Sequence, residues 1–111
     1  MLFCLTANYT AQSLNAIMNN PTANRVAAAT QLVEAAGGKV VSMYSTVKDG
    51  PGVMVIFDVP EPSSAAAISG VVTATGAVTN VALQRLLSPD EVVTVRQKAA
   101  QIRGAYKAPG Q

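Results

Sequence analysis

The sequence contains no histidine, no tryptophan and only one cysteine among its 111 residues. Without histidine the chain lacks the commonest general base, the usual neutral metal ligand and most catalytic triads. The single cysteine, Cys4, excludes a disulfide within the chain and a site with several cysteine ligands. Because Cys4 lies in a short apolar run, inert packing in the core is its expected role. No catalytic residue is therefore predicted.

Charge is also scarce, since 13% of the residues are charged, half are hydrophobic, and the formal net charge is +2. There is no run of lysine and arginine and few aromatics, so no nucleic-acid partner is expected. No stretch approaches the length of a membrane span, and the first residues do not resemble a basic leader before a long apolar run. We therefore expect a cytoplasmic protein without a membrane partner.

Sites for metals and phosphates are not indicated either. The carboxylates are scattered, so no metal ion or other cofactor is expected. The segment Gly50-Pro51-Gly52 lacks the Lys-Ser/Thr ending and the following helix of a phosphate-binding loop. The pair Gly37-Gly38 follows a helix, which is the wrong place for a dinucleotide-binding turn.

Hydrophobic periodicity predicts four strands at residues 2–7, 39–46, 53–59 and 77–87. Between the first two strands, Thr10 caps a helix that Asn20-Pro21 interrupts, and Pro21 begins a second helix that stops at Gly37-Gly38. Ser63 or Ser64 caps an alanine-rich helix that extends to Gly76.

The last helix has the clearest start, because Ser88, Pro89 and Glu91 form a capping box with proline at the first helical position. After it, apolar residues recur at steps of three and four and make one packing stripe, composed of Val92, Val95, Ala99, Ile102 and Tyr106. We expect residues 1–87 to form the domain and residues 88–111 to form an added helix with a frayed tail.

The order β-α-β-β-α-β followed by a helix predicts an α+β ferredoxin-like sandwich with an antiparallel four-stranded sheet. The hairpin strands are expected to be apolar on both faces. In strand 53–59, Met54 and Ile56 point to one face and the other hydrophobic residues point to the opposite face. In strand 39–46, Val41 and Met43 are expected on the face opposite to Val40 and Tyr44. One face belongs to the helices. The other face is expected to be covered by a second subunit related by two-fold symmetry, or alternatively by the C-terminal helix.

Several segments resemble the small bacterial GYD-domain proteins. They are Tyr9-Thr10, Arg25, Gly37-Gly38-Lys39, Tyr44, residues 55–60 and residues 76–86. The similarity spans roughly residues 1–95. The Gly-Tyr-Asp signature itself is not retained, and the corresponding place contains Asp49-Gly50-Pro51-Gly52. The resemblance implies a dimeric α+β barrel and no established biochemical activity.

Four residues are candidates for ligand binding: Tyr9, Arg25, Tyr44 and Asp58. The two tyrosines are expected to frame a cavity between sheet and helices, or else to pack with their hydroxyls at its rim. Arg25 is expected to pair with Glu61 or an anionic ligand, or to be solvated. Alternation places Asp58 on the face of Met54 and Ile56. If Asp58 is buried, it needs a cationic partner, which Arg85 or Lys39 on a neighbouring strand can supply; otherwise it is a solvated acid at the end of its strand.

Three functions are compatible with these features. The favoured one is a non-catalytic homo-oligomeric domain that holds a small apolar or anionic ligand. The second is a cofactor-free oxygenase or isomerase that uses the four candidate residues in one pocket, an analogy drawn from the fold. The third is an assembly module that uses its C-terminal helix.

Overall fold

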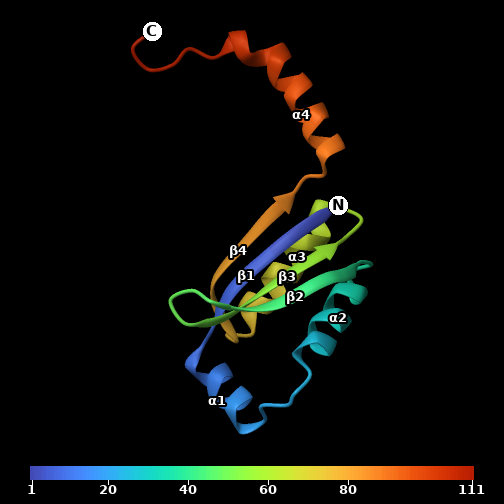
Figure 1. Ribbon diagram of the computed structural model, residues 1–111, viewed down its shortest axis with the longest axis vertical. Coiled ribbons are helices and arrows are strands. Elements are labelled where there is room, and N and C mark those ends of the chain that lie inside the picture. Colours follow the sequence, from blue (N-terminus) through green and yellow to red (C-terminus); the bar gives the residue numbers. More distant parts are fainter.

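The computed structural model describes residues 1–111 and has an α+β fold with an open antiparallel sheet of four strands (Figure 1). In chain order the elements are β1 (Leu2–Tyr9), α1 (Ala11–Asn19), α2 (Arg25–Ala35), β2 (Lys39–Val47), β3 (Pro51–Asp58), α3 (Pro62–Ala74), β4 (Val78–Leu86), α4 (Pro89–Ile102) and the 3₁₀ turn η1 (Arg103–Ala105). The strand order is β2-β3-β1-β4, so another strand splits each β-α-β unit. The predicted α+β, ferredoxin-like plan is confirmed.

The two central strands, β1 and β3, carry most of the core. Their antiparallel register places Phe3 opposite Phe57 and Leu5 opposite Val55. Because side chains alternate along a strand, these residues point to one face of the sheet. The rings of Phe3 and Phe57 stack with their centroids 6.1 Å apart. The buried cluster comprises Phe3, Leu5, Ala7, Val33, Val53, Val55, Phe57, Val59, Ala65, Ile68 and Val78.

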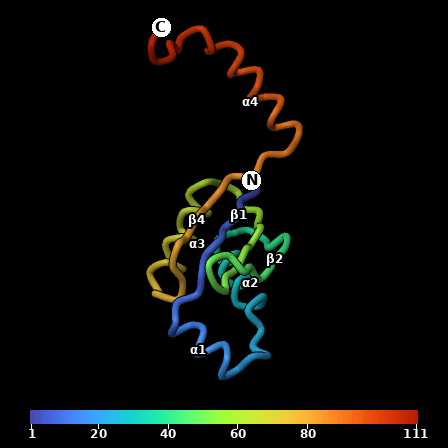
Figure 2. The backbone as a smooth tube through the Cα atoms, turned by 60° about the vertical axis from the view of Figure 1, so that its left-hand side comes forward, coloured from blue at the N-terminus to red at the C-terminus, as the bar shows by residue number.

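The helices cover this face of the sheet unevenly. Helix α2 packs over β2 and α3 packs over β4, so the helices lie above the two edge strands (Figure 2). The central strands β3 and β1 therefore lie beneath the space between α2 and α3. None of the helices combines the length and the apolar character that a membrane span requires.

The helix starts differ from the predicted ones at two places. Helix α2 begins at Arg25 after the cap Asn24, whose side chain accepts a hydrogen bond of 2.9 Å from the backbone amide of Ala27. Pro21 lies in the preceding turn because the better cap comes three residues later. Helix α3 begins at Pro62 after Glu61, and the predicted caps Ser63 and Ser64 lie inside its first turn.

Strand β2 also differs from its predicted alternation. A bulge between Val40 and Ser42 shifts the register against β3, so that Val40 lies opposite Phe57 and Met43 lies opposite Val55. Val40 and Met43 consequently share the helix-covered face, and Tyr44 lies opposite Met54 on the open face. The expectation that Val41 and Met43 oppose Val40 and Tyr44 is wrong.

Helix α4 points away from the sheet and gives the subunit an elongated shape (Figure 1). The radius of gyration is 17.6 Å, compared with about 13 Å for a compact domain of this length. No residue of α4 is buried. The alternative that the C-terminal helix covers the open face of its own sheet is therefore wrong for the single subunit.

Gly38 lies where the end of α2 approaches the end of β3. A Cβ atom at this position would overlap the carbonyl oxygen of Asp58 and lie 2.7 Å from Cγ1 of Val59. We predict that Gly38→Ala lowers the free energy of unfolding by about 1–3 kcal/mol, as overpacking does.

Urea denaturation followed by circular dichroism measures this change. Gly70→Ala is the control, because a Cβ at Gly70 meets nothing within 4 Å and alanine favours the helix. Equal stability of the two variants would contradict the close approach of Gly38 to the end of β3.

Candidate functional site

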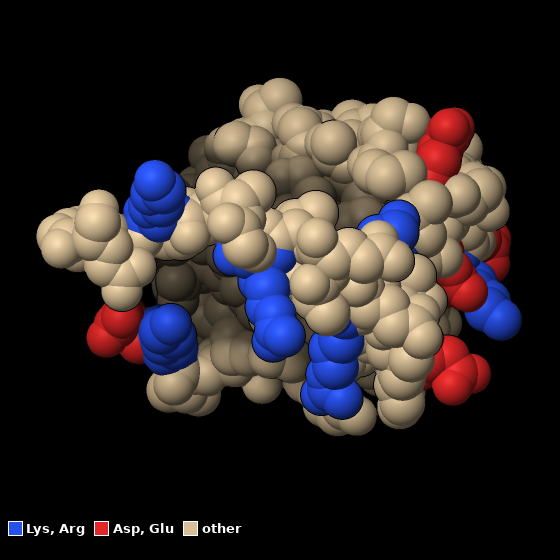
Figure 3. Space-filling view, turned by 90° about the horizontal axis from the view of Figure 1, so that it is seen from above, with Lys and Arg blue, Asp and Glu red and all other residues tan.

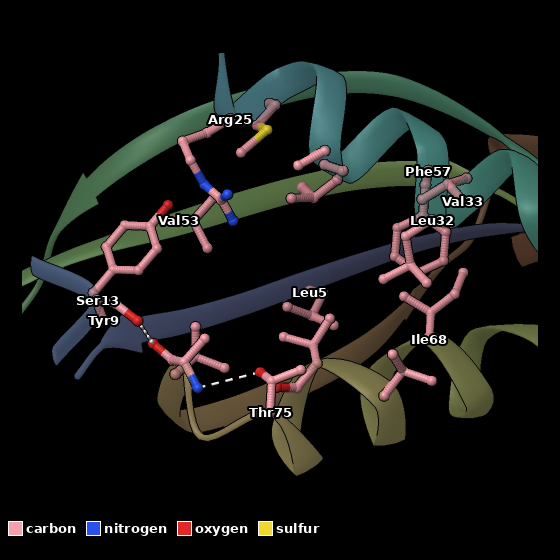
Figure 4. A pocket seen from close by; sticks show the side chains of 18 of the residues that line it. Leu5, Tyr9, Ser13, Arg25, Leu32, Val33, Val53, Phe57, Ile68 and Thr75 are labelled. Carbon is pink, nitrogen blue, oxygen red and sulfur yellow. Dashed lines mark hydrogen bonds between the residues drawn. The ribbon is translucent and has the colours of Figure 1, made fainter. Parts of the chain in front are cut away.

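A cavity of about 390 Å³ lies between the sheet and the helices (Figure 4). Its floor is formed by the central strands through Leu5, Val53 and Val55, and its walls by α1, α2 and α3. The cavity exists because α2 and α3 pack over opposite edge strands and leave the centre of the sheet without a helix above it. Its volume is in the lower part of the usual range for ligand pockets, about 300–1,000 Å³.

The lining is almost entirely apolar. Of the 20 residues that line the cavity, 17 are hydrophobic, and Arg25 is the only charged one. Leu32 and Val33 of α2 and Ile68 of α3 enclose one end, close to Phe57 (Figure 4). The polar side chains gather at the other end.

Two of these polar groups, Ser13 and Thr75, already have hydrogen-bond partners. The Ser13 hydroxyl donates a hydrogen bond of 2.7 Å to the carbonyl oxygen of Ala77. The Thr75 hydroxyl donates to the carbonyl oxygen of Val72 at 2.7 Å and accepts from the amide of Ala77 at 3.2 Å. These contacts hold the start of α1 against the turn between α3 and β4.

Tyr9 and Arg25 present the remaining polar groups. Tyr9 ends β1, Arg25 is the first residue of α2, and their side chains extend toward each other at the polar end of the cavity (Figure 4). The two ion pairs of the subunit join Met1 to Asp58 and Arg85 to Glu91, so Arg25 has no carboxylate partner. In particular, the expected pairing of Arg25 with Glu61 does not form.

The other two candidate residues lie outside the cavity. Tyr44 is on the open face of the sheet, opposite Met54, and 59% of it is exposed. Asp58 is also on the open face, opposite Leu2 on β1 and Lys39 on β2. The structure therefore brings Tyr9 and Arg25 together and separates them from Tyr44 and Asp58.

Asp58 is engaged by the start of the chain. The N-terminal ammonium group of Met1 donates a hydrogen bond of 2.8 Å to Oδ1 of Asp58. This hydrogen bond is the main reason why the pKa of Asp58 is below its usual value; partial burial opposes it, and Lys39 and Arg85 add smaller effects. Lys39 and Arg85, the partners expected from the sequence, therefore act at longer range.

Cys4 does not belong to the cavity. It lies on the open face between Ile56 of β3 and Gln84 of β4, and burial raises the pKa of its thiol. A raised pKa leaves little thiolate at neutral pH, so the thiol is a poor nucleophile there.

Sequence reasoning missed most of the lining. Ile17, Leu32 and Val72 lie on apolar faces of helices and line the cavity. Their spacing predicts that they face the sheet, and it does not predict how far apart the helices lie. Ser13 was missed as well, although its position three residues after the cap Thr10 is a recognisable helix-start pattern.

The GYD-domain family model matches residues 3–95, which include the sheet apart from Leu2, the cavity and the first half of α4. The chain belongs to the GYD-domain family. Among curated proteins, no sequence matches it.

In this GYD domain, residues 49–52, which the sequence resemblance sets at the place of the signature, span the end of the turn between β2 and β3 and the first two residues of β3. Asp49 and Gly50 have positive φ angles of 58° and 135° there, and the side chain of Asn8 donates a hydrogen bond of 2.9 Å to the carbonyl oxygen of Lys48. None of the residues 49–52 lines the cavity. The departure from the signature therefore lies outside the cavity lining.

The Asp58 contact predicts a pH-dependent stability. Because the pKa of Asp58 is lower in the folded state than the usual value of about 3.9, its stabilising effect is present at neutral pH and is lost below about pH 4. Asp58→Asn is expected to lower the urea midpoint at neutral pH, with a difference from the unmodified protein that shrinks toward about pH 3.

The control for this prediction is Asp49→Asn, which neutralises a carboxylate that forms no ion pair. If Asp58→Asn lowered the urea midpoint by the same amount at neutral pH and at about pH 3, the contact between the N-terminal ammonium group and Asp58 would not account for the loss of stability.

Proposed function

We propose that this GYD domain is a non-catalytic, homo-oligomeric binding domain for small carboxylates with an apolar body. The observation that carries this proposal is the cavity of about 390 Å³, in which Arg25 is the only charged residue and has no carboxylate partner. The apolar lining suits a hydrocarbon or aromatic body, whose removal from water stabilises the complex.

The polar end of the cavity defines the expected head group. The hydroxyls of Ser13 and Thr75 have partners, whereas no hydrogen bond engages the guanidinium of Arg25 or the hydroxyl of Tyr9. Both free groups donate hydrogen bonds, and guanidinium geometry matches a carboxylate with two parallel bonds. A ligand with one carboxylate therefore fits better than a neutral or cationic one.

Binding is favoured over catalysis by the chemistry of the lining. The hydroxyls of Ser13 and Thr75 donate their hydrogen bonds to backbone carbonyl oxygens. The lining contains no histidine or carboxylate that could act as a general base and activate them. An oxygenase or isomerase that used Tyr9, Arg25, Tyr44 and Asp58 together needs all four in one pocket. Two of the four lie on the opposite face of the sheet, which counts against that alternative.

Self-association is the second part of the proposal. On the open face, Cys4, Met54 and Ile56 form an apolar centre, and Leu2 and Leu86 continue it toward one end. Polar residues surround this centre: Asn8, Lys39, Ser42, Asp58, Thr79 and Gln84. An apolar centre with a polar rim is the usual anatomy of a protein interface, and the same face of a second subunit supplies a complementary surface.

We predict that the protein binds decanoate and that Arg25→Gln weakens this binding about ten- to a hundredfold, because a charge-assisted hydrogen bond contributes about 1.5–3 kcal/mol. Isothermal titration calorimetry measures the change. Decanol, which has the same chain without the charge, is expected to bind both proteins equally.

Two further variants make this test specific. Ala29→Phe fills the cavity and should weaken both ligands, whereas Ala35→Phe, on the same helix but outside the cavity, should weaken neither. Lys48→Gln controls for the loss of one positive charge elsewhere. Equal loss of decanoate binding in Lys48→Gln and Arg25→Gln would contradict the assigned role of Arg25.

For the open face, we predict that Ile56→Lys lowers the oligomeric state, because it places an unpaired charge in the centre of the interface. Size-exclusion chromatography with light scattering measures the molar mass. Gln31→Lys, on the exposed side of α2, should leave the assembly unchanged. If the unmodified protein were a monomer, the proposed self-association would be wrong. The proposed carboxylate site would not be affected by that result.

A further inference from the structure

Helix α4 has an apolar side that its own subunit leaves largely uncovered. Its apolar residues recur at alternating steps of three and four, and 49% of Val95 and 68% of Ile102 are exposed; the stripe consists of Val92, Val95, Ala99 and Ile102. A period of 3.5 residues is the pattern by which one helix packs along another. The stripe therefore favours packing against a helix from outside the subunit.

The direction of α4 is fixed at its first turn. Ser88 and Glu91 form a capping box with two hydrogen bonds of 3.2 Å, and the Glu91 carboxylate pairs with Arg85 of β4. Arg85 in turn donates to the carbonyl oxygen of Leu2 at 3.2 Å and lies 5.6 Å from the centroid of the Phe3 ring. These contacts hold α4 away from its own sheet.

Beyond the first turn of α4, which contains Asp90 and Glu91, the flanks of the stripe carry only positive charge. Arg96, Lys98 and Arg103 follow Glu91 with no acidic residue after it, and none of them forms an ion pair. Seen from the α4 end, basic side chains are spaced along the foremost part of the molecule and acidic ones lie at its margins (Figure 3). Two α4 helices packed in parallel would bring these cations together, so like-charge repulsion disfavours parallel pairing.

Helix α3 offers a matching surface. Its 13 residues include no charged side chain, although Ala66, Ala67, Gly70 and Ala74 are exposed. An exposed helix side usually carries charged residues, and a helix without them is usually covered. Glu61, which precedes α3, is the acidic residue closest to its start and forms no ion pair.

We propose that α4 docks in antiparallel orientation on α3 of a second copy of this chain, and that the second copy returns the same contact. The helices have 14 and 13 residues, so they match in length. The bulky stripe of α4 then meets the small, uncharged side of α3, which permits close approach of the two helices. The antiparallel direction also places Arg103 near Glu61 of the other copy, where opposite charges attract.

A disulfide test addresses the contact directly. The variant Ala66→Cys/Ala99→Cys, in a Cys4→Ser background, places one thiol on each of the two surfaces. Both alanines are exposed, so these changes leave the core of the subunit intact. After mild oxidation, non-reducing gel electrophoresis and intact mass measurement should find a covalent dimer joined between positions 66 and 99.

Three controls identify the geometry. The variant Ala66→Cys/Gln97→Cys, with the second thiol on the opposite side of α4, should form much less covalent dimer. The single variant Ala99→Cys should not crosslink to itself. An equimolar mixture of the two single variants, Ala66→Cys and Ala99→Cys, should yield a covalent heterodimer.

Other outcomes would overturn the proposal. A disulfide within one chain would mean that α4 folds back on its own α3. Efficient crosslinking of Ala99→Cys alone would mean that two α4 helices pair. The absence of any crosslink in a protein that light scattering shows to be oligomeric would mean that the open sheet face, and not α4, holds the copies together.

Discussion

The antiparallel pairing of β1 with β3 is the contact on which the rest of the structure depends. It aligns Phe3 with Phe57 and Leu5 with Val55 on one face, and Cys4 with Ile56 on the other. The first face becomes the core and the floor of the cavity. The second remains open, and its apolar centre becomes a surface that a second subunit can cover. A shift of this register by one residue would exchange the two faces and remove both features.

The cavity follows from where the helices sit on that sheet. Connections through α2 and α3 lead to edge strands, so each helix packs near an edge, and the centre stays uncovered. Apolar side chains such as Leu32 and Ile68 line the gap, and the hydroxyls of Ser13 and Thr75 donate hydrogen bonds to backbone carbonyl oxygens. What remains free there is the guanidinium of Arg25 and the hydroxyl of Tyr9, which together favour an anionic head group.

Much of the fold could be predicted from the sequence, because strand alternation, turn residues and the capping box at Ser88 are local patterns. The bulge after Val40 was not predictable, since it arises from pairing with β3, and it moved Tyr44 to the open face. The sequence predicts Tyr9, Arg25 and Asp58 alike as ligand-binding candidates. Tyr9 and Arg25 share the cavity, whereas Asp58 pairs with the N-terminal ammonium group. Contacts between residues far apart in the chain determine where Tyr44 and Asp58 lie, and local sequence patterns do not predict such contacts.

Native mass spectrometry of the freshly purified protein, with and without added decanoate, tests the central claim most directly. The account predicts an oligomer that carries one apolar carboxylic acid per subunit, either retained from the cell or taken up from the added decanoate. A protein that stays free of ligand in excess decanoate would contradict the assignment of the cavity as a carboxylate site.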